Sequence, residues 1–240
     1  MEIKTISAVL EKKIDETADI KRFILKTETP FLYQAGQWGF LQFEKNGQNF
    51  SKPLSFCGSP KDGVVEFATI ISNSEYKQNL NSLALGDKMS IKGPMGNFTL
   101  KDLNNSPVAF LAGGIGITPF ISMIKDSHVH NINLDGVLFY ANRTFNTIAY
   151  KKDLELFESK IKNLKVVHLL SNLEEKDQST WQGETGYIRK EIILKYMDNP
   201  KSRHFFIVGP PPFVNAMKDL LLNDLQVPSN QVILEQFAGY

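Results

Sequence analysis

The sequence predicts two domains, an antiparallel β-barrel followed by an α/β domain that contains a parallel sheet. In the first hundred residues, short and partly alternating apolar segments are separated by Gly, Pro and Asn, which is typical of β-strands. Beyond a polar stretch at 101–107, short apolar runs alternate with helical patterns. This change of pattern predicts a first domain over 1–102 and a second over 103–240.

About six short strands in the first domain favour an antiparallel barrel. The clearest of them are expected at 8–10, 21–26, 38–43, 64–71 and 88–92, with one helix at 74–83. In the second domain, strands are expected at 108–111, 136–140, 166–170 and 204–208, and helices at 119–125, 153–161, 190–197 and 212–222. Strands that alternate with helices predict a parallel sheet with helices on its faces.

The composition is that of an ordinary globular protein, with 240 residues, 42% hydrophobic and 22% charged. A formal net charge of +1 gives no basic excess that would indicate a nucleic-acid partner. A single cysteine, Cys57, excludes an internal disulfide framework and a cysteine-ligated iron–sulfur cluster. The four histidines lack the spacing of metal ligands, so no metal site is expected.

The N-terminus has no apolar core of the kind that signal peptides contain. The one long apolar run, at 108–124, is interrupted by three glycines and a proline, so it reads as strand, turn and helix rather than as a membrane span. We therefore expect a cytoplasmic protein without a membrane-spanning segment.

The turn that follows the first strand of the second domain contains Gly113, Gly114 and Gly116. Glycines let the backbone turn sharply and bring its N–H groups close to a ligand. Thr118 is the expected N-cap of the next helix, and Pro119 suits the first helical position. A helix N-terminus beside such a turn predicts a phosphate site, although the spacing is not GxGxxG and a plain tight turn is the alternative.

The other strands of this domain also end in residues that suit ligand binding, which in open parallel sheets occurs beyond the carboxyl ends of the strands. Asn142 and Arg143 follow the second strand, and Ser171 follows the third. The fourth ends at Gly209 and Pro210. Each has an alternative reading, Arg143 as a solvated loop charge and the others as turn residues.

The chain resembles the ferredoxin–NADP reductase superfamily over nearly its whole length. The segment 52–55 (KPLS) lies where that family has an Arg-x-Tyr-Ser flavin motif, and 86–88 (GDK) with 93–98 (GPMGNF) are similar to the segment that closes its barrel. The loop 112–120 (AGGIGITPF) resembles its pyridine-nucleotide pyrophosphate loop, and 209–211 (GPP) resembles its CGPP loop. The resemblance implies a barrel that binds FAD, which would lie between the domains and exchange a hydride with NADH or NADPH.

The resemblance assigns roles to Lys52, Pro53, Leu54 and Ser55 as cofactor-binding residues. Residue 52 would neutralise the flavin pyrophosphate, residue 54 would cover the ring, and Ser55 would bond near flavin N5 and act as a catalytic residue. Alternation along a strand puts Lys52 and Leu54 on one side and Ser55 on the other. Lys52 replaces an arginine fork and Leu54 replaces an aromatic ring, so both contacts depart from the family pattern.

Tyr76 and Lys77 stand at the start of the helix expected in the first domain. Lys77 falls where many relatives place a phosphate-binding Ser or Thr, and a lysine there can serve the same phosphate. Tyr76 would cover the adenine or ribityl part of the flavin. The alternative for both residues is a solvated helix face.

The chain reads Glu-Gln-Phe-Ala-Gly-Tyr at its end, with Phe237 and Tyr240 as the aromatic residues. Relatives often bring such an aromatic residue against the flavin, so we expect Phe237 or Tyr240 to shield the ring until nicotinamide displaces it, which makes Tyr240 a predicted catalytic residue. The alternative is that Phe237 packs in a last strand and that Tyr240 is frayed.

These expectations predict an NAD(P)H-dependent flavin oxidoreductase that passes electrons to a separate acceptor, such as ferredoxin, flavodoxin, another redox protein or a small molecule. The alternative is a non-catalytic or regulatory flavoprotein subunit that docks on a partner, because Leu54 and Val208 replace the usual aromatic and cysteine. NADH is favoured over NADPH, since Asn172 and Thr185 stand where NADP-specific relatives place cations. Arg143 is the residue that argues against this preference.

Overall fold

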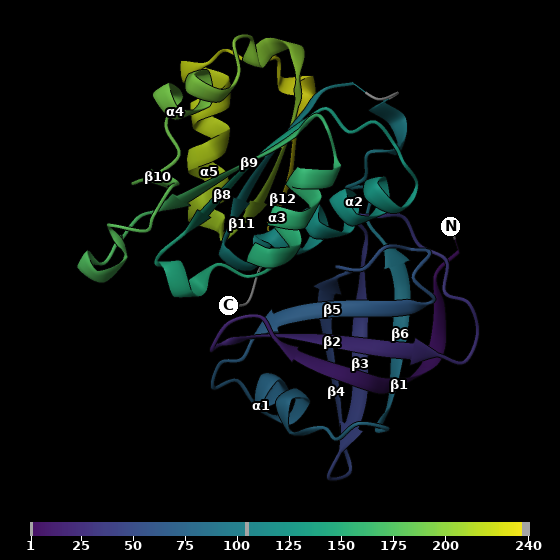
Figure 1. The fold of residues 1–240 in the computed structure, drawn as a ribbon. Coiled ribbons are helices and arrows are strands. Elements are labelled where there is room, and N and C mark those ends of the chain that lie inside the picture. Colours follow the sequence, from purple (N-terminus) through teal and green to yellow (C-terminus); the bar gives the residue numbers. More distant parts are fainter. Residues whose placement is uncertain (1, 104–105, 237–240) are drawn as a thin grey trace. The chain divides into compact units, whose positions relative to one another are not determined.

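The computed structural model describes residues 2–103 and 106–236, and it contains two sheets (Figure 1). The chain divides into two compact units. Met1–Asp102 and Thr118–His130 make up the first unit, and Leu103–Ile117 and Asn131–Tyr240 make up the second. Helix α2 (Thr118–Val129) is therefore grouped with the N-terminal unit, although the glycine turn before it belongs to the second. The domain division at residue 103 stays a prediction.

The first unit is an antiparallel six-stranded sheet with the strand order β4-β3-β6-β1-β2-β5. Its strands are β1 (Lys4–Asp15), β2 (Ile20–Thr27), β3 (Trp38–Lys45), β4 (Gln48–Ser55), β5 (Val64–Ile70) and β6 (Lys88–Met95). A bridge between Phe56 and Phe67 brings the chain after β4 against β5, the opposite edge of the sheet. Helix α1 (Glu75–Ser82) lies between β5 and β6 in the sequence. The predicted antiparallel barrel and its helix are thus confirmed.

Aromatic side chains fill the barrel interior. Phe23, Phe56 and Phe67 are fully buried, and the rings of Phe56 and Phe67 lie 5.2 Å apart. In β2, the buried Phe23 and Leu25 alternate with more exposed residues, as expected for a strand with one face toward the core. This packing holds β4, which carries the predicted flavin motif, at an edge of the sheet.

The second unit is a parallel sheet with the strand order β10-β9-β8-β7-β11-β12. Its strands are β7 (Val108–Gly113), β8 (Gly136–Asn142), β9 (Leu164–Leu170), β10 (Glu184–Thr185), β11 (His204–Gly209) and β12 (Val232–Gln236). Helices α4 (Lys190–Tyr196) and α5 (Pro211–Asp219) cover one face, and α3 (Lys151–Lys160) lies on the other (Figure 1). Every residue of β7 is buried, as expected for a strand covered on both faces. The predicted α/β domain is confirmed.

The helix boundaries differ from the predictions, most clearly at α2 and in the last predicted helix. A 3-10 turn over Gly114–Ile117 runs directly into α2, so Thr118 is the first α-helical residue rather than the N-cap. The positive φ of Gly114, +54°, reverses the chain at once after β7 and lets helical geometry begin at the glycines themselves. The last predicted helix is divided into α5 and a π-helical turn over Leu220–Asp224.

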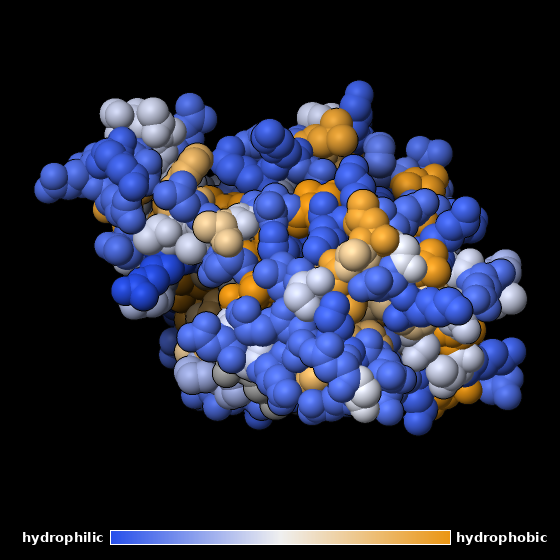
Figure 2. All heavy atoms as spheres, turned by 90° about the horizontal axis from the view of Figure 1, so that it is seen from below, coloured by the Kyte–Doolittle hydropathy of each residue, from blue (hydrophilic) through white to orange (hydrophobic). Residues whose placement is uncertain are grey.

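Hydrophilic residues cover most of the face in Figure 2, and hydrophobic residues appear between them in separate groups. Leu32 is among the most exposed large hydrophobic residues, at 72%. Over the described residues, none of the helices combines the length and the apolar character that a membrane span needs.

The edge strand β12 carries a partly buried acid, Glu235. Glu235 pairs in register with Val208 of the parallel neighbour β11. Its Oε2 atom is buried and has no hydrogen-bond partner among the described residues. Burial raises the pKa of this carboxyl from 4.5 to about 7, because the charged form loses its hydration. The folded protein therefore favours the protonated form of Glu235.

This shift predicts a pH-dependent stability. A carboxyl whose pKa is raised in the folded state adds stability at low pH, and that stability is lost as the pH rises through about 7. Glu235→Gln should therefore match the wild type near pH 5 and exceed its free energy of unfolding by roughly 1–3 kcal/mol at pH 8. Urea denaturation at both pH values measures the difference, with Glu11→Gln at an exposed position as control. An equal difference in the free energy of unfolding at both pH values would contradict the raised pKa of Glu235.

Candidate functional site

The strand order of the second unit places a topological switch point at the carboxyl ends of β7 and β11. These strands are neighbours, but the chain proceeds from β7 toward β8 and β9 on one side, whereas β11 continues to β12 on the other. Open α/β sheets bind ligands at such a switch point. The two loops that meet there are the predicted glycine turn and the Gly209-Pro210 loop.

Three of the glycines allow these two loops to touch. A Cβ atom on Gly116 would lie 2.5 Å from the carbonyl oxygen of Val208. Cβ atoms on Gly113 and Gly209 would lie 2.9 Å and 2.7 Å from the ring of Phe213. Any larger residue would push the loops apart, because real Cβ contacts are longer than these distances. Gly113, Gly116 and Gly209 are therefore needed for close packing at the switch point.

Gly114 has a different environment. A Cβ atom on this residue would meet nothing within 4 Å, so the turn faces open space at this point. Gly114 also begins the 3-10 turn that continues into α2, and the first N–H groups of a helical segment have no partner within it. Open space in front of such groups suits a phosphate. The buried Thr118 follows inside α2.

The loop after β11 shapes the switch point, but its prolines supply no N–H donors for a ligand. Pro210 is the N-cap of α5, and Pro211 and Pro212 occupy its first turn. Proline has no N–H group, so these residues cannot donate to an anion. Of the two helix starts at the switch point, the one at Gly114 is thus the better anion site.

The residues that follow β8 and β9 contact each other. The N–H groups of Ser171 and Asn172 donate to the carbonyls of Asn142 and Arg143, at 3.0 Å and 2.8 Å. Both polar side-chain atoms of Asn142 are buried and lack a partner among the described residues. Arg143 is exposed. Asn142 therefore has unused hydrogen-bonding capacity beside an exposed guanidinium.

In the first unit, β4 presents the predicted flavin motif. Ser55 is 5% exposed, and its Oγ atom lacks a hydrogen-bond partner within the described part of the chain. An unsatisfied buried hydroxyl costs about 1–3 kcal/mol, so this atom is suited to a ligand group. Leu54 packs partly against the barrel core, and Pro53 is exposed.

Two lysines converge near this strand. Burial lowers the pKa of Lys77, and the positive charge of Lys52 lowers it further. In the described ranges, no carboxylate forms an ion pair with Lys52, which is exposed. Lys77 lies in the first turn of α1, where the helix dipole also favours an anion. Two like charges held near each other fit a diphosphate, because it would remove their repulsion.

Tyr76 does not occupy the predicted position. Its side chain is 6% exposed and lies in the barrel core, where its hydroxyl donates to the carbonyl of Leu41 at 3.2 Å and its ring lies 5.3 Å from Phe43. Burial raises the pKa of this hydroxyl. Because the α1 face that carries Tyr76 packs inward, we withdraw Tyr76 as a residue that covers the flavin.

Two further groups concern the end of the chain. Phe237 and Tyr240, predicted to shield the flavin, lie outside the described residues. Glu235, which the site predictions omitted, is half-buried and pairs with Val208 near the carboxyl end of β11. An acid directly after the apolar run 232–234 of β12 is the sequence signal that could have identified it.

Comparison with known families matches both halves of the chain. The family model described as "Oxidoreductase FAD-binding domain" matches residues 7–100. The model described as "Oxidoreductase NAD-binding domain" matches residues 110–219. The glycine turn and the Gly209-Pro210 loop fall within the second match, and the segment 52–55 falls within the first.

Curated relatives and solved structures agree with these matches. The chain is 29% identical over 215 residues to the glycine betaine monooxygenase reductase subunit of Pseudomonas aeruginosa, covering 88% of this chain and 58% of that relative. It is 29% identical over 206 residues to NADH-cytochrome b5 reductase 1 of Kluyveromyces lactis, covering 83% of this chain and 72% of the relative. The structure of the CS-b5R domains of human Ncb5or in the NAD+ form aligns with a TM-score of 0.81 at 26% identity, over 98% of this chain and 70% of that one.

The first of these relatives is thus considerably longer than the chain, which spans 58% of its length. The two domain matches follow each other in the order that the sequence predicts, and each coincides with the corresponding sheet. The chain belongs to the ferredoxin–NADP reductase superfamily, with an oxidoreductase FAD-binding domain followed by an oxidoreductase NAD-binding domain.

Proposed function

We propose that the protein is an NADH-dependent flavin oxidoreductase that passes electrons from NADH, through FAD, to a separate acceptor. The observation that carries this proposal is the presence of two complementary anion sites in one chain. Lys52 and Lys77 converge in the FAD-binding domain, and the Gly114 turn opens at the switch point of the NAD-binding domain. The names of the relatives, a monooxygenase reductase subunit and an NADH-cytochrome b5 reductase, support an electron-transfer role.

On the barrel side, Lys52 and Lys77 would balance the charge of the FAD pyrophosphate. Ser55 would complete the site, because its hydroxyl can both donate and accept a hydrogen bond and has no partner among the described residues. FAD, when bound, would take up a hydride from NADH, giving NAD+ and reduced flavin whose two electrons pass to the acceptor. The chain's own task is to hold the reacting groups in place.

On the nucleotide side, the N–H groups that begin at Gly114 would bind the NADH pyrophosphate. Asn142 would supply hydrogen bonds further along the same edge of the sheet. The surroundings of Ser171 favour NADH, since Lys176, a cation of the following loop, is paired with Glu174 at 2.5 Å. A 2′-phosphate needs cationic partners to offset its desolvation.

The acceptor is a separate redox partner in this proposal. The relatives named above are reductases for different acceptors, one for a monooxygenase and one for cytochrome b5. Their shared feature is transfer to a second protein or component. We therefore propose a redox protein, such as an oxygenase component or a haem protein, as the acceptor class.

Lys52→Ala should weaken FAD binding. Losing a charge-assisted contact to phosphate costs about 1.5–3 kcal/mol, so the Kd for FAD should rise about ten- to a hundredfold. Fluorescence titration of the apoprotein with FAD measures this change. Lys26→Ala, at an exposed position of β2, is the matched control and should leave the Kd unchanged. An equal Kd for Lys52→Ala and the control would remove Lys52 from the flavin site.

Ser55→Ala should keep FAD but slow its reduction by NADH by about tenfold, which corresponds to about 1.4 kcal/mol in the barrier. The proposed contact of Ser55 is with the reacting end of the ring, so its loss affects the reaction more than the binding. Anaerobic stopped-flow spectroscopy measures the rate. Ser51→Ala, on the same strand, removes only an exposed contact with Gln42 and is the control. A Ser55→Ala rate equal to that of wild type would reassign Ser55 to strand packing.

Steady-state kinetics with an artificial acceptor test the activity and the nucleotide choice together. We expect kcat/KM to be higher for NADH than for NADPH, because Lys176, the cation of the loop after β9, is paired with Glu174 and, within the described residues, only Arg143 at the end of β8 would face a 2′-phosphate. A preference of about tenfold for NADPH that Arg143→Ala abolishes would instead identify Arg143 as the phosphate ligand. No oxidation of either nucleotide would favour a non-catalytic flavoprotein subunit.

A further inference from the structure

Helix α2 is anchored to the barrel by polar side chains on one of its faces. Ser122, Lys125 and Asp126 have the spacing of residues that share a helix face. The Ser122 hydroxyl donates to the carbonyl of Gly58 at 2.6 Å, and the Ser59 hydroxyl donates to Asp126 at 2.8 Å. All these contacts lie within the first compact unit.

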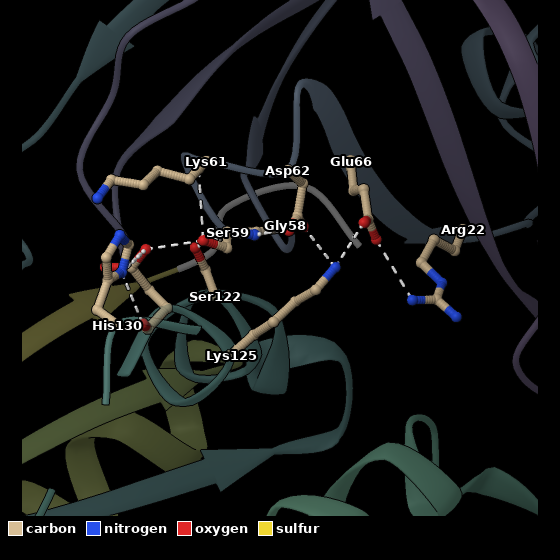
Figure 3. Close-up of polar contacts among 10 residues, drawn as sticks. Arg22, Gly58, Ser59, Lys61, Asp62, Glu66, Ser122, Lys125 and His130 are labelled. Carbon is tan, nitrogen blue, oxygen red and sulfur yellow. Dashed lines mark hydrogen bonds and ion pairs between the residues drawn. The ribbon is translucent and has the colours of Figure 1, made fainter. Parts of the chain in front are cut away.

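Lys125 is the centre of this anchor (Figure 3). Its Nζ lies 2.6 Å from Asp62 and 2.8 Å from Glu66. Glu66, whose side chain is 5% exposed, also contacts Arg22 at 3.3 Å, and Arg22 lies 2.8 Å from Glu16. Burial alone would lower the pKa of Lys125, but the carboxylates of Glu66 and Asp62 outweigh it and raise the pKa. Lys125 is therefore positively charged, and its ammonium group binds both carboxylates.

The anchor connects two segments that the proposed function uses. Its barrel partners lie at 58–66, directly after the segment 52–55 that carries the flavin motif. At the other end, α2 follows the glycine turn at 113–117 without an intervening loop. The chain thus passes from the glycine turn into a helix whose barrel partners follow the flavin motif in the sequence.

A buried charge network is a poor way to gain stability, because apolar residues of similar volume often stabilise as much or more. What such a network supplies is a defined geometry, since each charge must meet its partner at hydrogen-bond distance. Around Lys125, two carboxylates fix the position of one ammonium group, and that group fixes the helix.

We propose that Lys125 is a positioning residue for flavin reduction: it holds α2 on the barrel, and because α2 continues from the glycine turn without a loop, the ion pairs of Lys125 restrain the backbone of that turn. This inference rests on the proposed function. It predicts that Lys125 affects the reaction although it touches neither the nucleotide nor the flavin.

The test compares the FAD-loaded wild type with Lys125→Met, Lys125→Arg and Lys21→Met. Lys21 is the matched control, since its side chain is 25% exposed against 24% for Lys125 and pairs with Asp15 away from α2. Anaerobic stopped-flow measurement gives the limiting rate of flavin reduction and the apparent Kd for NADH. Hydrogen exchange of the segment 113–125 gives a readout that does not depend on activity.

Lys125→Met should retain FAD, lower the limiting rate about tenfold or more and raise exchange in 113–125, because a displacement of about 1 Å can cost on the order of a hundredfold in rate. Lys125→Arg should recover most of the rate, and Lys21→Met should change neither readout beyond about twofold. If Lys125→Met does not fold, Asp62→Asn, which weakens one of the two contacts, should shift both readouts in the same direction.

A limiting rate and an exchange rate for Lys125→Met, or for Asp62→Asn in its place, within about twofold of Lys21→Met would overturn the positioning role and leave the network as ordinary packing. If neither nucleotide reduces the wild-type flavin, the proposed function fails. The exchange comparison then still decides whether Lys125 holds α2 and the turn before it.

Discussion

Backbone contact between the ends of β7 and β11 is the constraint on which the nucleotide site depends. A side chain on Gly116 would strike the carbonyl of Val208, and side chains on Gly113 or Gly209 would strike the ring of Phe213. The two loops can meet at the switch point only because these positions lack a Cβ atom. Their close packing leaves the Gly114 turn directed toward open space, where a phosphate can reach the first N–H groups of the helical segment.

The barrel forms its candidate anion site from charged side chains rather than from the shape of its backbone. Lys52 is exposed at an edge strand and Lys77 lies at the start of α1, so the fold brings together two cations whose repulsion an anionic ligand would relieve. Ser55, on the same strand as Lys52, keeps a buried hydroxyl without a partner in the described part of the chain. These features carry an energetic cost in the free protein that a bound cofactor would remove.

The sequence was sufficient to predict the fold, because the fold depends on local patterns, whereas the roles of the candidate site residues stay predictions. Alternating residues indicated the barrel strands, and continuous apolar runs such as β7 indicated the parallel sheet. Tyr76 was misplaced because a helix of eight residues shows too little periodicity to reveal which face packs inward. The grouping of Lys125 with Asp62 and Glu66 could not be predicted, since these partners lie about sixty residues apart and only the tertiary fold joins them.

The glycines show a related limit of prediction from the sequence. All four were expected to serve a ligand, and the structure gives Gly113, Gly116 and Gly209 a packing role while Gly114 alone faces open space. Sequence identifies such a turn but cannot distinguish backbone approach to a ligand from backbone approach to a neighbouring loop. The edge strand β10, with only two residues, was below the length that any periodic pattern can reveal.

The central claim is that one chain holds FAD and accepts a hydride from NADH at the switch point of its second sheet. Anaerobic titration of the purified, FAD-loaded protein with NADH, followed by flavin absorbance, tests this claim most directly. The account predicts complete loss of the oxidised flavin absorbance after one equivalent of NADH per chain. Retention of that absorbance in excess NADH and in excess NADPH would contradict it.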